Sequence, residues 1–254
     1  MPQGRAAVPE DELVSMEVEG VEFVLRVPER RAERARVMLL FGGRGWPGGK
    51  TLARFCFEEL ADRHGVVLVA PSLEKGEYWE PSSGTGRLLL AAVARLERMY
   101  GVDAEHLYLY GYSAGGQCAA LLAAFLGGRV AAWGAHACGV YPEKELLPTA
   151  PAPALLTCGR GDAGRDALTR QFGYIYREKG GQLLRQSFPG DHELDPRALE
   201  LARAWFDAVL SGKKPSVYGD DDSGLRVPAA RAREIDVEFR NPLFQGKVEA
   251  LWSR

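Results

Sequence analysis

The sequence has few cysteines, and none of them are paired at the spacing that binds zinc. It contains four cysteines and no C-x-x-C motif, and each cysteine stands in an apolar segment. Widely spaced cysteines of this kind are typical of reduced thiols in a hydrophobic core. We therefore expect neither a metal site nor a disulfide from Cys56, Cys118, Cys138 and Cys158.

A marked excess of charge and a long apolar run are also missing. The formal net charge of −2 gives no electrostatic reason to expect binding to nucleic acid or to an anionic membrane surface. No run of about 18 apolar residues occurs, so no membrane-spanning helix is expected. The N-terminal stretch MPQGRAAVPEDELVSMEVEG carries acidic side chains and lacks the apolar stretch of a signal peptide. These features favour a cytoplasmic location.

What the chain does contain is a regular alternation of short apolar runs and helical patterns. Its 254 residues suffice for one large domain with a good core. The short runs are apolar throughout, which predicts strands that are covered on both faces. Such strands alternate with helices in parallel α/β folds. Residues 16–27 instead alternate in polarity around Gly20, which predicts an antiparallel hairpin. A single helical face is expected over residues 52–60. The buried strands are predicted at 37–41, 66–70, 107–110, 130–135, 154–158 and 182–188.

The pattern changes near residue 212. We expect residues 1–14 to be a lead-in, 15–211 to form the α/β domain, and 212–254 to be a C-terminal extension. The segment KKPSVYGDDDSG is typical of a linker, and the extension is too small for a core of its own. It should therefore pack on the domain or on a partner subunit, the latter giving a homodimer.

The stretch HLYLYGYSAGG, residues 106–116, carries the strongest functional signal. An apolar strand runs into the motif G-x-S-x-G around Ser113, and a helical pattern follows. A serine between strand and helix in this motif is typical of a nucleophile elbow. The alternative is a glycine-rich turn with a chance serine.

A serine nucleophile needs a base, and the chain has only four histidines. His64 and His106 are expected away from the site, and His136 lies near the end of a strand with no motif around it. His192 follows the last predicted strand, in the chain order Ser–Asp–His that this architecture requires. It is the predicted base.

The acid that orients the base is predicted to be Asp162, which follows the strand ending at Cys158. Its alternative role is to cap the next helix. Asp166 lies further into that helix. Asp191, Glu193 and Asp195 are sequence neighbours of the histidine, and neighbours on a turn rarely point at the same ring nitrogen.

Backbone N–H groups are expected to form the oxyanion hole. One donor should be Ala114, directly after the nucleophile. The second should come from the glycine-rich loop after Phe41, with Gly43 preferred and Arg44 next. The side chains predicted to contact the substrate are Arg44, Trp46 and Trp79.

Taken together, these residues resemble the α/β-hydrolase superfamily. The segments FGGRGWPGG, FCFEELADRHGVVLVAP and MYGVDAEHLYLYGYSAGG are similar to its esterase/polyhydroxybutyrate depolymerase group, which includes feruloyl and acetyl xylan esterases. The resemblance covers about residues 35–210. It implies a serine esterase with Ser113 as nucleophile, Asp162 as acid and His192 as base, acting on a small-molecule ester without cofactor or metal.

Two other functions stay open on the residues alone. A serine peptidase of the prolyl-oligopeptidase type also has a motif like GYSAGG. A hydrolase fold can also serve as a non-catalytic binding protein, because fold alone does not decide function. The short connection between the strands at 130–135 and 154–158 leaves no room for a lid domain, so we expect an open site and short acyl chains.

Overall fold

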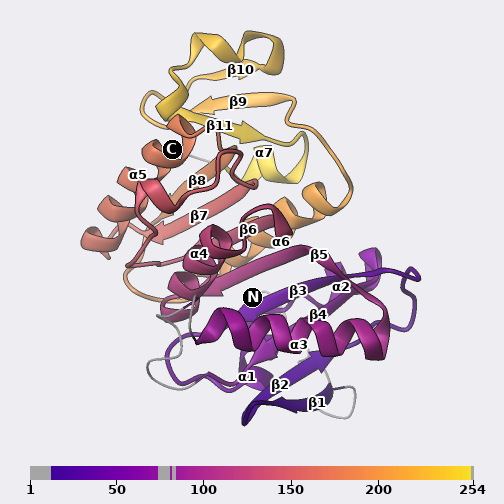
Figure 1. Ribbon diagram of the computed structural model, residues 1–254. Coiled ribbons are helices and arrows are strands. Elements are labelled where there is room, and N and C mark those ends of the chain that lie inside the picture. Colours follow the sequence, from indigo (N-terminus) through magenta and orange to yellow (C-terminus); the bar gives the residue numbers. More distant parts are fainter. Residues whose placement is uncertain (1–12, 74–80, 82–83, 253–254) are drawn as a thin grey trace, which may run out of the picture.

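The centre of the molecule is an eight-stranded sheet, seen in the computed structural model that describes residues 13–73, 81 and 84–252. The strand order is β1-β2-β4-β3-β5-β6-β7-β8, antiparallel at β1-β2-β4 and parallel from β4 to β8. The predicted α/β fold with an N-terminal hairpin is confirmed (Figure 1). The strands are β1 (Leu13–Val18), β2 (Val21–Arg26), β3 (Ala35–Phe41), β4 (Val66–Pro71), β5 (Val102–Tyr112), β6 (Val130–His136), β7 (Ala154–Gly159) and β8 (Leu183–Phe188).

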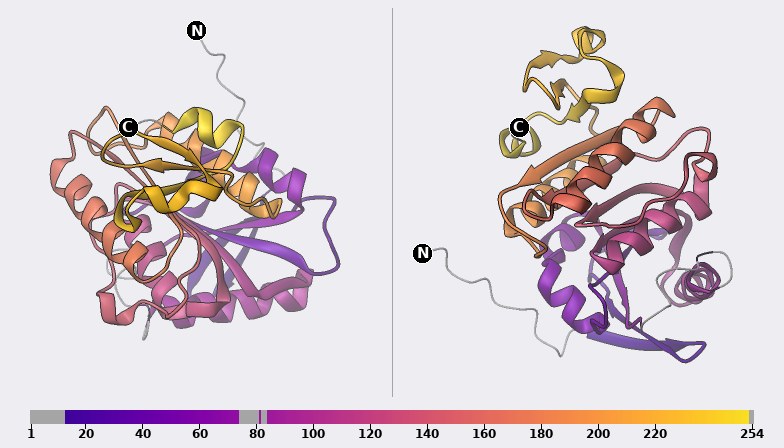
Figure 2. Two further views of the ribbon diagram at one scale, coloured as in Figure 1. Left: turned by 90° about the horizontal axis from the view of Figure 1, so that it is seen from above. Right: turned by 90° about the vertical axis from the view of Figure 1, so that its left-hand side faces the viewer.

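Helices cover both faces of this sheet, which explains why its strands are almost continuously apolar. Side chains of α3 (Thr85–Tyr100), α4 (Ala114–Leu126) and α5 (Ala163–Glu178) form one core with the sheet. Side chains of α1 (Gly48–Phe55), α2 (Glu58–His64) and α6 (Pro196–Leu210) form the core on the opposite face. The ribbon views in Figure 2 show helices on both sides of the sheet.

The single helical face predicted over residues 52–60 is wrong, because two helices meet there. Cys56 ends α1 in the left-handed conformation, with φ of 54°, and its N–H bonds to the carbonyl of Leu52. The break turns Phe57 fully into the core, where its ring packs on those of Tyr110 and Phe206 at 5.5 and 6.0 Å between centroids. Burial of this aromatic side chain therefore overrides the helical periodicity.

The C-terminal extension forms a second, three-stranded sheet of order β10-β9-β11, drawn in orange to yellow in Figure 1. The linker-like segment around residues 213–224 contains β9, so the prediction of a linker is wrong for that strand. The elements are β9 (Val217–Asp220), β10 (Arg226–Pro228), β11 (Arg240–Leu243) and helix α7 (Lys247–Leu251).

The extension covers the free edge of β8, the last strand of the main sheet. The Asn241 side-chain oxygen accepts the Arg185 N–H at 2.6 Å, and the Trp252 indole N–H donates to the Arg185 carbonyl at 3.1 Å. An edge strand otherwise presents unpaired backbone groups to other chains. Trp252 is also buried in the core shared with α6. The extension thus packs on its own chain, and a homodimer through it stays a prediction.

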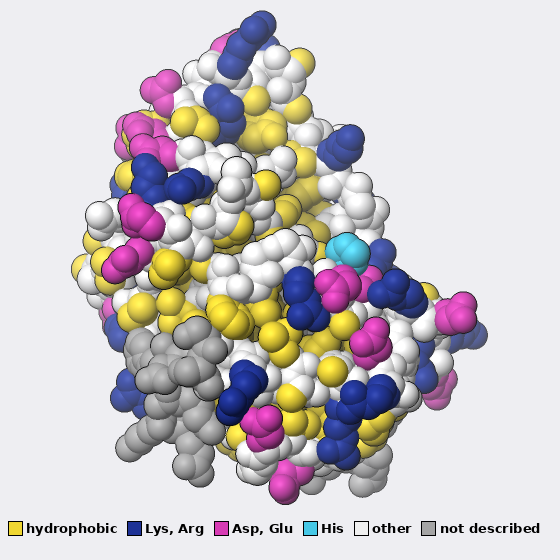
Figure 3. Space-filling model, in the orientation of Figure 1, with side chains coloured by type: hydrophobic (Ala, Val, Ile, Leu, Met, Phe, Trp, Pro, Cys, Tyr) yellow, Lys and Arg dark blue, Asp and Glu magenta, His cyan; other side chains and the backbone are white. Residues whose placement is uncertain are grey.

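Charged side chains of both signs are interspersed over the face shown in Figure 3. None of the described helices is both long and apolar enough to cross a membrane. Within the described residues, no group of three or more His, Cys, Asp or Glu side chains is placed to hold a metal ion. The four cysteines all lie in the described part of the chain and form no disulfide.

Candidate active site

Ser113 stands on a strained turn between β5 and α4. Its φ of 55° and ψ of −118° are unusual for a residue with a side chain. The Ser113 N–H donates to the His136 carbonyl at 2.9 Å, and its own carbonyl accepts the Gln117 N–H. The turn places the serine at the N-terminus of α4, as the G-x-S-x-G motif predicts.

The glycines flanking Ser113 are required by close backbone contacts. A Cβ on Gly111 would collide with the backbone of Gly115, one turn away across the elbow. A Cβ on Gly115 would collide with the carbonyls of Phe41 and Gly42 at the end of β3. The first turn of α4 therefore rests directly on the glycine-rich loop after β3.

The structure brings the three residues predicted as a catalytic triad into one hydrogen-bonded chain. The Ser113 Oγ lies 2.9 Å from the His192 Nε2, and the His192 Nδ1 lies 2.7 Å from an Asp162 carboxylate oxygen. Asp162 follows β7 and His192 follows β8, at the carboxyl ends of strands. The Asp162 side chain is 11% exposed and that of His192 is 35% exposed. The histidine is thus accessible to solvent, while the carboxylate is largely shielded from water.

The other carboxylates near His192 have different partners. Asp166 accepts the Ser187 hydroxyl at 2.5 Å. Asp195 is the N-cap of α6 and accepts the Arg197 backbone N–H at 2.7 Å. Asp162 makes no side-chain cap to its own helix; the Arg165 guanidinium donates to it at 3.2 Å instead. Neither the motif nor the chain order indicated Arg165, although its i+3 position on a helix was a usable signal.

Two further side chains support His192, and the sequence assigned neither of them. The Tyr112 ring stacks with those of both His136 and His192, at 5.8 and 5.7 Å between centroids and within about 25° of parallel. The Tyr112 hydroxyl donates to the His192 carbonyl at 3.3 Å. Burial lowers the pKa of His136 to about 4, so its ring is neutral at physiological pH.

The neutral, buried His136 predicts a specific loss of stability in acid. Its pKa is 6.5 when exposed and about 4 in the folded protein, where burial outweighs the nearby Asp195 carboxylate. Between these values the unfolded chain binds a proton that the native chain does not, so the free energy of unfolding falls as pH falls. The contribution of His136 to this loss should reach about 3 kcal/mol. Urea titrations at pH 7 and 4.5 measure it.

Two variants separate this contribution from the titration of other groups. His136→Gln should reduce the difference in stability between pH 7 and 4.5. His106→Gln, which removes an exposed histidine that pairs with Asp103 at 2.9 Å, should not reduce that difference, because the pair it removes stabilises the protein in acid. Equal pH dependence of all three proteins would contradict the expectation.

The predicted substrate and oxyanion residues lie on the loop after β3 and at the elbow. Ala114 is the first residue of α4, where helix N–H groups have no intrahelical acceptor. Gly43 packs against the Tyr112 ring, and its carbonyl accepts the Trp46 N–H at 3.0 Å. Trp46 also packs on the Tyr112 ring, at 5.6 Å, and Arg44 is exposed. Trp79 lies outside the described residues.

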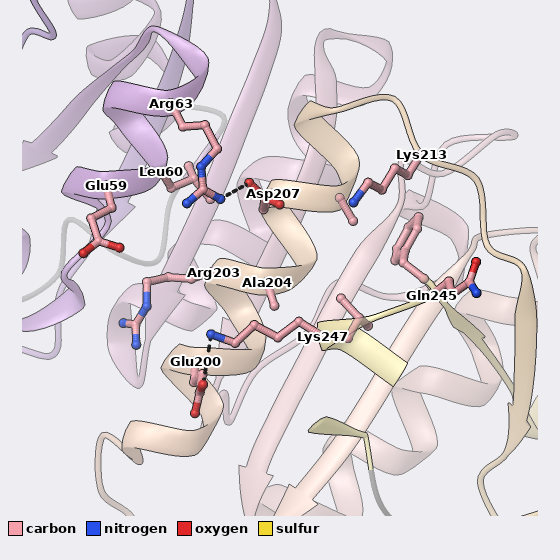
Figure 4. Close-up of a pocket in the computed structure, with 13 residues that line it drawn as sticks. Glu59, Leu60, Arg63, Glu200, Arg203, Ala204, Asp207, Lys213, Gln245 and Lys247 are labelled. Atoms are coloured by element: carbon pink, nitrogen blue, oxygen red, sulfur yellow. Dashed lines mark hydrogen bonds and ion pairs between the residues drawn. The ribbon is translucent and has the colours of Figure 1, made fainter. Parts of the chain in front are cut away.

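A pocket lies away from these residues, among α2, α6 and the C-terminal extension (Figure 4). Its volume is about 390 Å³. Ion pairs line it, with Arg63 on Asp207 at 2.7 Å and Lys247 on Glu200 at 3.0 Å. Such exposed pairs contribute about 0–1 kcal/mol each. They join helices across the groove and point to no reaction.

No family model matches the chain, and no curated protein is similar to it in sequence. Solved structures are similar in fold. An S-formylglutathione hydrolase from Agrobacterium tumefaciens superposes with a TM-score of 0.62 at 15% identity, covering 79% of this chain and 92% of the other. A ferulic acid esterase superposes with a TM-score of 0.61 at 15% identity, covering 78% of this chain and 95% of the other. A poly(3-hydroxybutyrate) depolymerase from Bordetella parapertussis superposes with a TM-score of 0.58 at 19% identity, covering 74% of this chain and 84% of the other. The chain therefore has the α/β-hydrolase fold.

Proposed function

We propose that the protein is a serine hydrolase that cleaves carboxylic esters through an acyl-enzyme on Ser113. The observation that carries the proposal is the continuous hydrogen-bonded chain from Ser113 through His192 to Asp162, at 2.9 and 2.7 Å. A hydroxyl, a base and an orienting acid in this geometry are the parts needed for acyl transfer by a serine.

In the first half of the reaction, the Ser113 Oγ attacks the ester carbonyl carbon while the His192 Nε2 takes its proton. Asp162 accepts the His192 Nδ1–H and stabilises the imidazolium. The tetrahedral intermediate then breaks its bond to the alcohol oxygen, which leaves with the proton from His192. In the second half, a water molecule deprotonated by His192 attacks the acyl-enzyme, releasing the acid and restoring Ser113.

Negative charge on the carbonyl oxygen needs donors already in place. We assign these to the backbone N–H groups of Ala114 and Gly43, with Arg44 next to them. The contact between the first turn of α4 and the loop after β3 supports this assignment. Arg44 and Trp46 stand on the same loop and are proposed to contact the substrate.

The likeness in fold to a hydrolase, an esterase and a depolymerase supports an ester rather than a peptide substrate. The connection between β6 and β7 contains one short 3-10 turn, Lys144–Leu146, and no lid domain within these described residues. This supports an open site, and we expect acetyl and butyryl esters to be cleaved in preference to esters of long fatty acids.

The proposal predicts covalent labelling of Ser113 by a fluorophosphonate probe. Peptide mapping of the labelled wild type should place the adduct on Ser113, because the base lowers the barrier to its attack. Ser113→Ala should not be labelled, and the matched variant Ser187→Ala should be labelled like the wild type. Absence of an adduct on folded wild-type protein, or an adduct that persists in Ser113→Ala, would refute the proposal.

A further inference from the structure

His136 is a fully buried titratable residue that the proposed mechanism does not use. It ends β6, and its backbone pairs in register with Tyr112, the residue before the nucleophile. Its backbone carbonyl accepts the Ser113 N–H at 2.9 Å. The next residue, Ala137, has a positive φ of 52° although it is not glycine. Both strands thus leave the sheet through a strained residue, and the two ends are tied together at His136.

The ring of His136 reaches the loop that carries the proposed base. Its Nε2 lies 2.9 Å from the Glu193 carbonyl, and its Nδ1 lies 2.9 Å from the Thr157 hydroxyl. A carbonyl only accepts, so the ring donates from Nε2 and accepts the Thr157 hydroxyl at Nδ1. The Asp195 backbone N–H also points at this Nε2, at a longer N···N distance of 3.4 Å, and we assign the tautomer from the shorter contact with the Glu193 carbonyl.

Tyr112 completes the support of the same loop. Its ring stacks with those of both His136 and His192, and its hydroxyl donates to the His192 carbonyl at 3.3 Å. Two successive carbonyls, those of His192 and Glu193, are therefore held by side chains from β5 and β6. The His192 side chain itself is held only by Asp162 and Ser113 among the hydrogen bonds of the described residues.

We propose that His136 is a positioning residue that sets the distance between the nucleophile and the base of the proposed esterase. Its backbone holds Ser113 and its ring holds the His192 loop, so one residue fixes both partners of the proton transfer. The inference rests on the proposed function.

Three variants distinguish positioning from packing. His136→Leu removes the donor but keeps an apolar side chain in the core. His136→Gln keeps an N–H group that can reach the Glu193 carbonyl. Thr157→Val removes the hydroxyl that fixes the ring tautomer. Thr169→Val is the matched control, because this buried hydroxyl bonds Tyr141 and is not in contact with His192.

For the folded fraction of each variant, kcat and KM on a short-chain ester should separate. His136→Leu should lower kcat by about 10²-fold with little change in KM, since a small displacement of reacting groups costs this much. His136→Gln should recover most of that loss, Thr157→Val should lie between the two, and Thr169→Val should match the wild type. Wild-type kcat in folded His136→Leu, or Gln no better than Leu, would overturn the proposal.

A spectroscopic readout keeps this test separate from the test of the proposed function. The proton between the His192 Nδ1 and Asp162 should give a downfield resonance in the ¹H NMR spectrum of the wild type, because it is shared with a carboxylate. In His136→Leu this resonance should be lost or broadened, and in His136→Gln it should be retained. If the wild type neither reacts with the fluorophosphonate nor cleaves esters, the proposed function fails; an unchanged resonance in His136→Leu refutes the positioning role.

Discussion

Asp162→Asn should lower kcat for ester hydrolysis by about 10⁴-fold with the fold intact. The Asp162 carboxylate lies 2.7 Å from the His192 Nδ1 and accepts a hydrogen bond from its N–H. An asparagine amide can instead donate to Nδ1, and the histidine then carries its proton on Nε2. That nitrogen faces the Ser113 hydroxyl at 2.9 Å and could no longer accept a proton from it. Steady-state kinetics on an acetyl ester, scaled to the folded fraction, measure the effect.

Asp166→Asn is the matched control for this variant. Asp166 stands on the same helix, and its partners are the Ser187 hydroxyl and the Arg185 guanidinium, at 2.5 and 3.7 Å. An asparagine there still accepts the hydroxyl, so kcat should stay within a few-fold of the wild type. If Asp162→Asn cost less than about tenfold, or no more than Asp166→Asn, a group other than Asp162 would have to orient His192.

The sequence predicts the proposed triad because each of its signals is either local or ordered along the chain. Ser113 is marked by its own strand-turn-helix context. Asp162 and His192 each follow a predicted strand, and carboxyl ends of parallel strands meet at one edge of a sheet. The role of His136 could not be predicted in this way. It depends on the register of β5 against β6 and on the path of the loop after β8, which no local pattern encodes.

The difference between local signals and long-range pairing also explains which parts of the fold were predicted. The parallel strands of the main sheet are largely buried, so their apolar runs identify them directly, whereas the hairpin of β1 and β2 is identified by its alternating polarity. The break after α1 falls at Cys56, a left-handed residue that is not glycine and therefore gives no turn signal. Strand β9 has a weak pattern of its own and exists through its pairing with β11, about twenty residues later.

Arg177→Met should lower the free energy of unfolding by about 3–5 kcal/mol. The side chain of Arg177 is 2% exposed and joins α5 and β8 to the C-terminal extension. It donates to the carbonyls of Leu183 and Glu238, and to the side chain of Asn241 at 2.8 Å. Methionine fits the apolar part of the site but removes these buried hydrogen bonds, and the Asn241 oxygen keeps only the Arg185 backbone N–H as a donor. Burial lowers the pKa of Arg177 to about 10, so the guanidinium is charged at neutral pH.

The neighbouring residue on α5 provides the control. Glu178 pairs with Lys144 at 2.9 Å, and both side chains are about half exposed, so Glu178→Gln should cost less than about 1 kcal/mol. Urea unfolding followed by tryptophan fluorescence compares the two variants, and hydrogen exchange locates the opening. If the free energy of unfolding of Arg177→Met falls by the expected amount in a single urea transition, the extension unfolds together with the main sheet. If Arg177→Met lowered the free energy of unfolding by less than about 1 kcal/mol, the prediction would be wrong. Apolar packing, in which Trp252 is buried in the core shared with α6, would then be what holds the extension over the edge of β8.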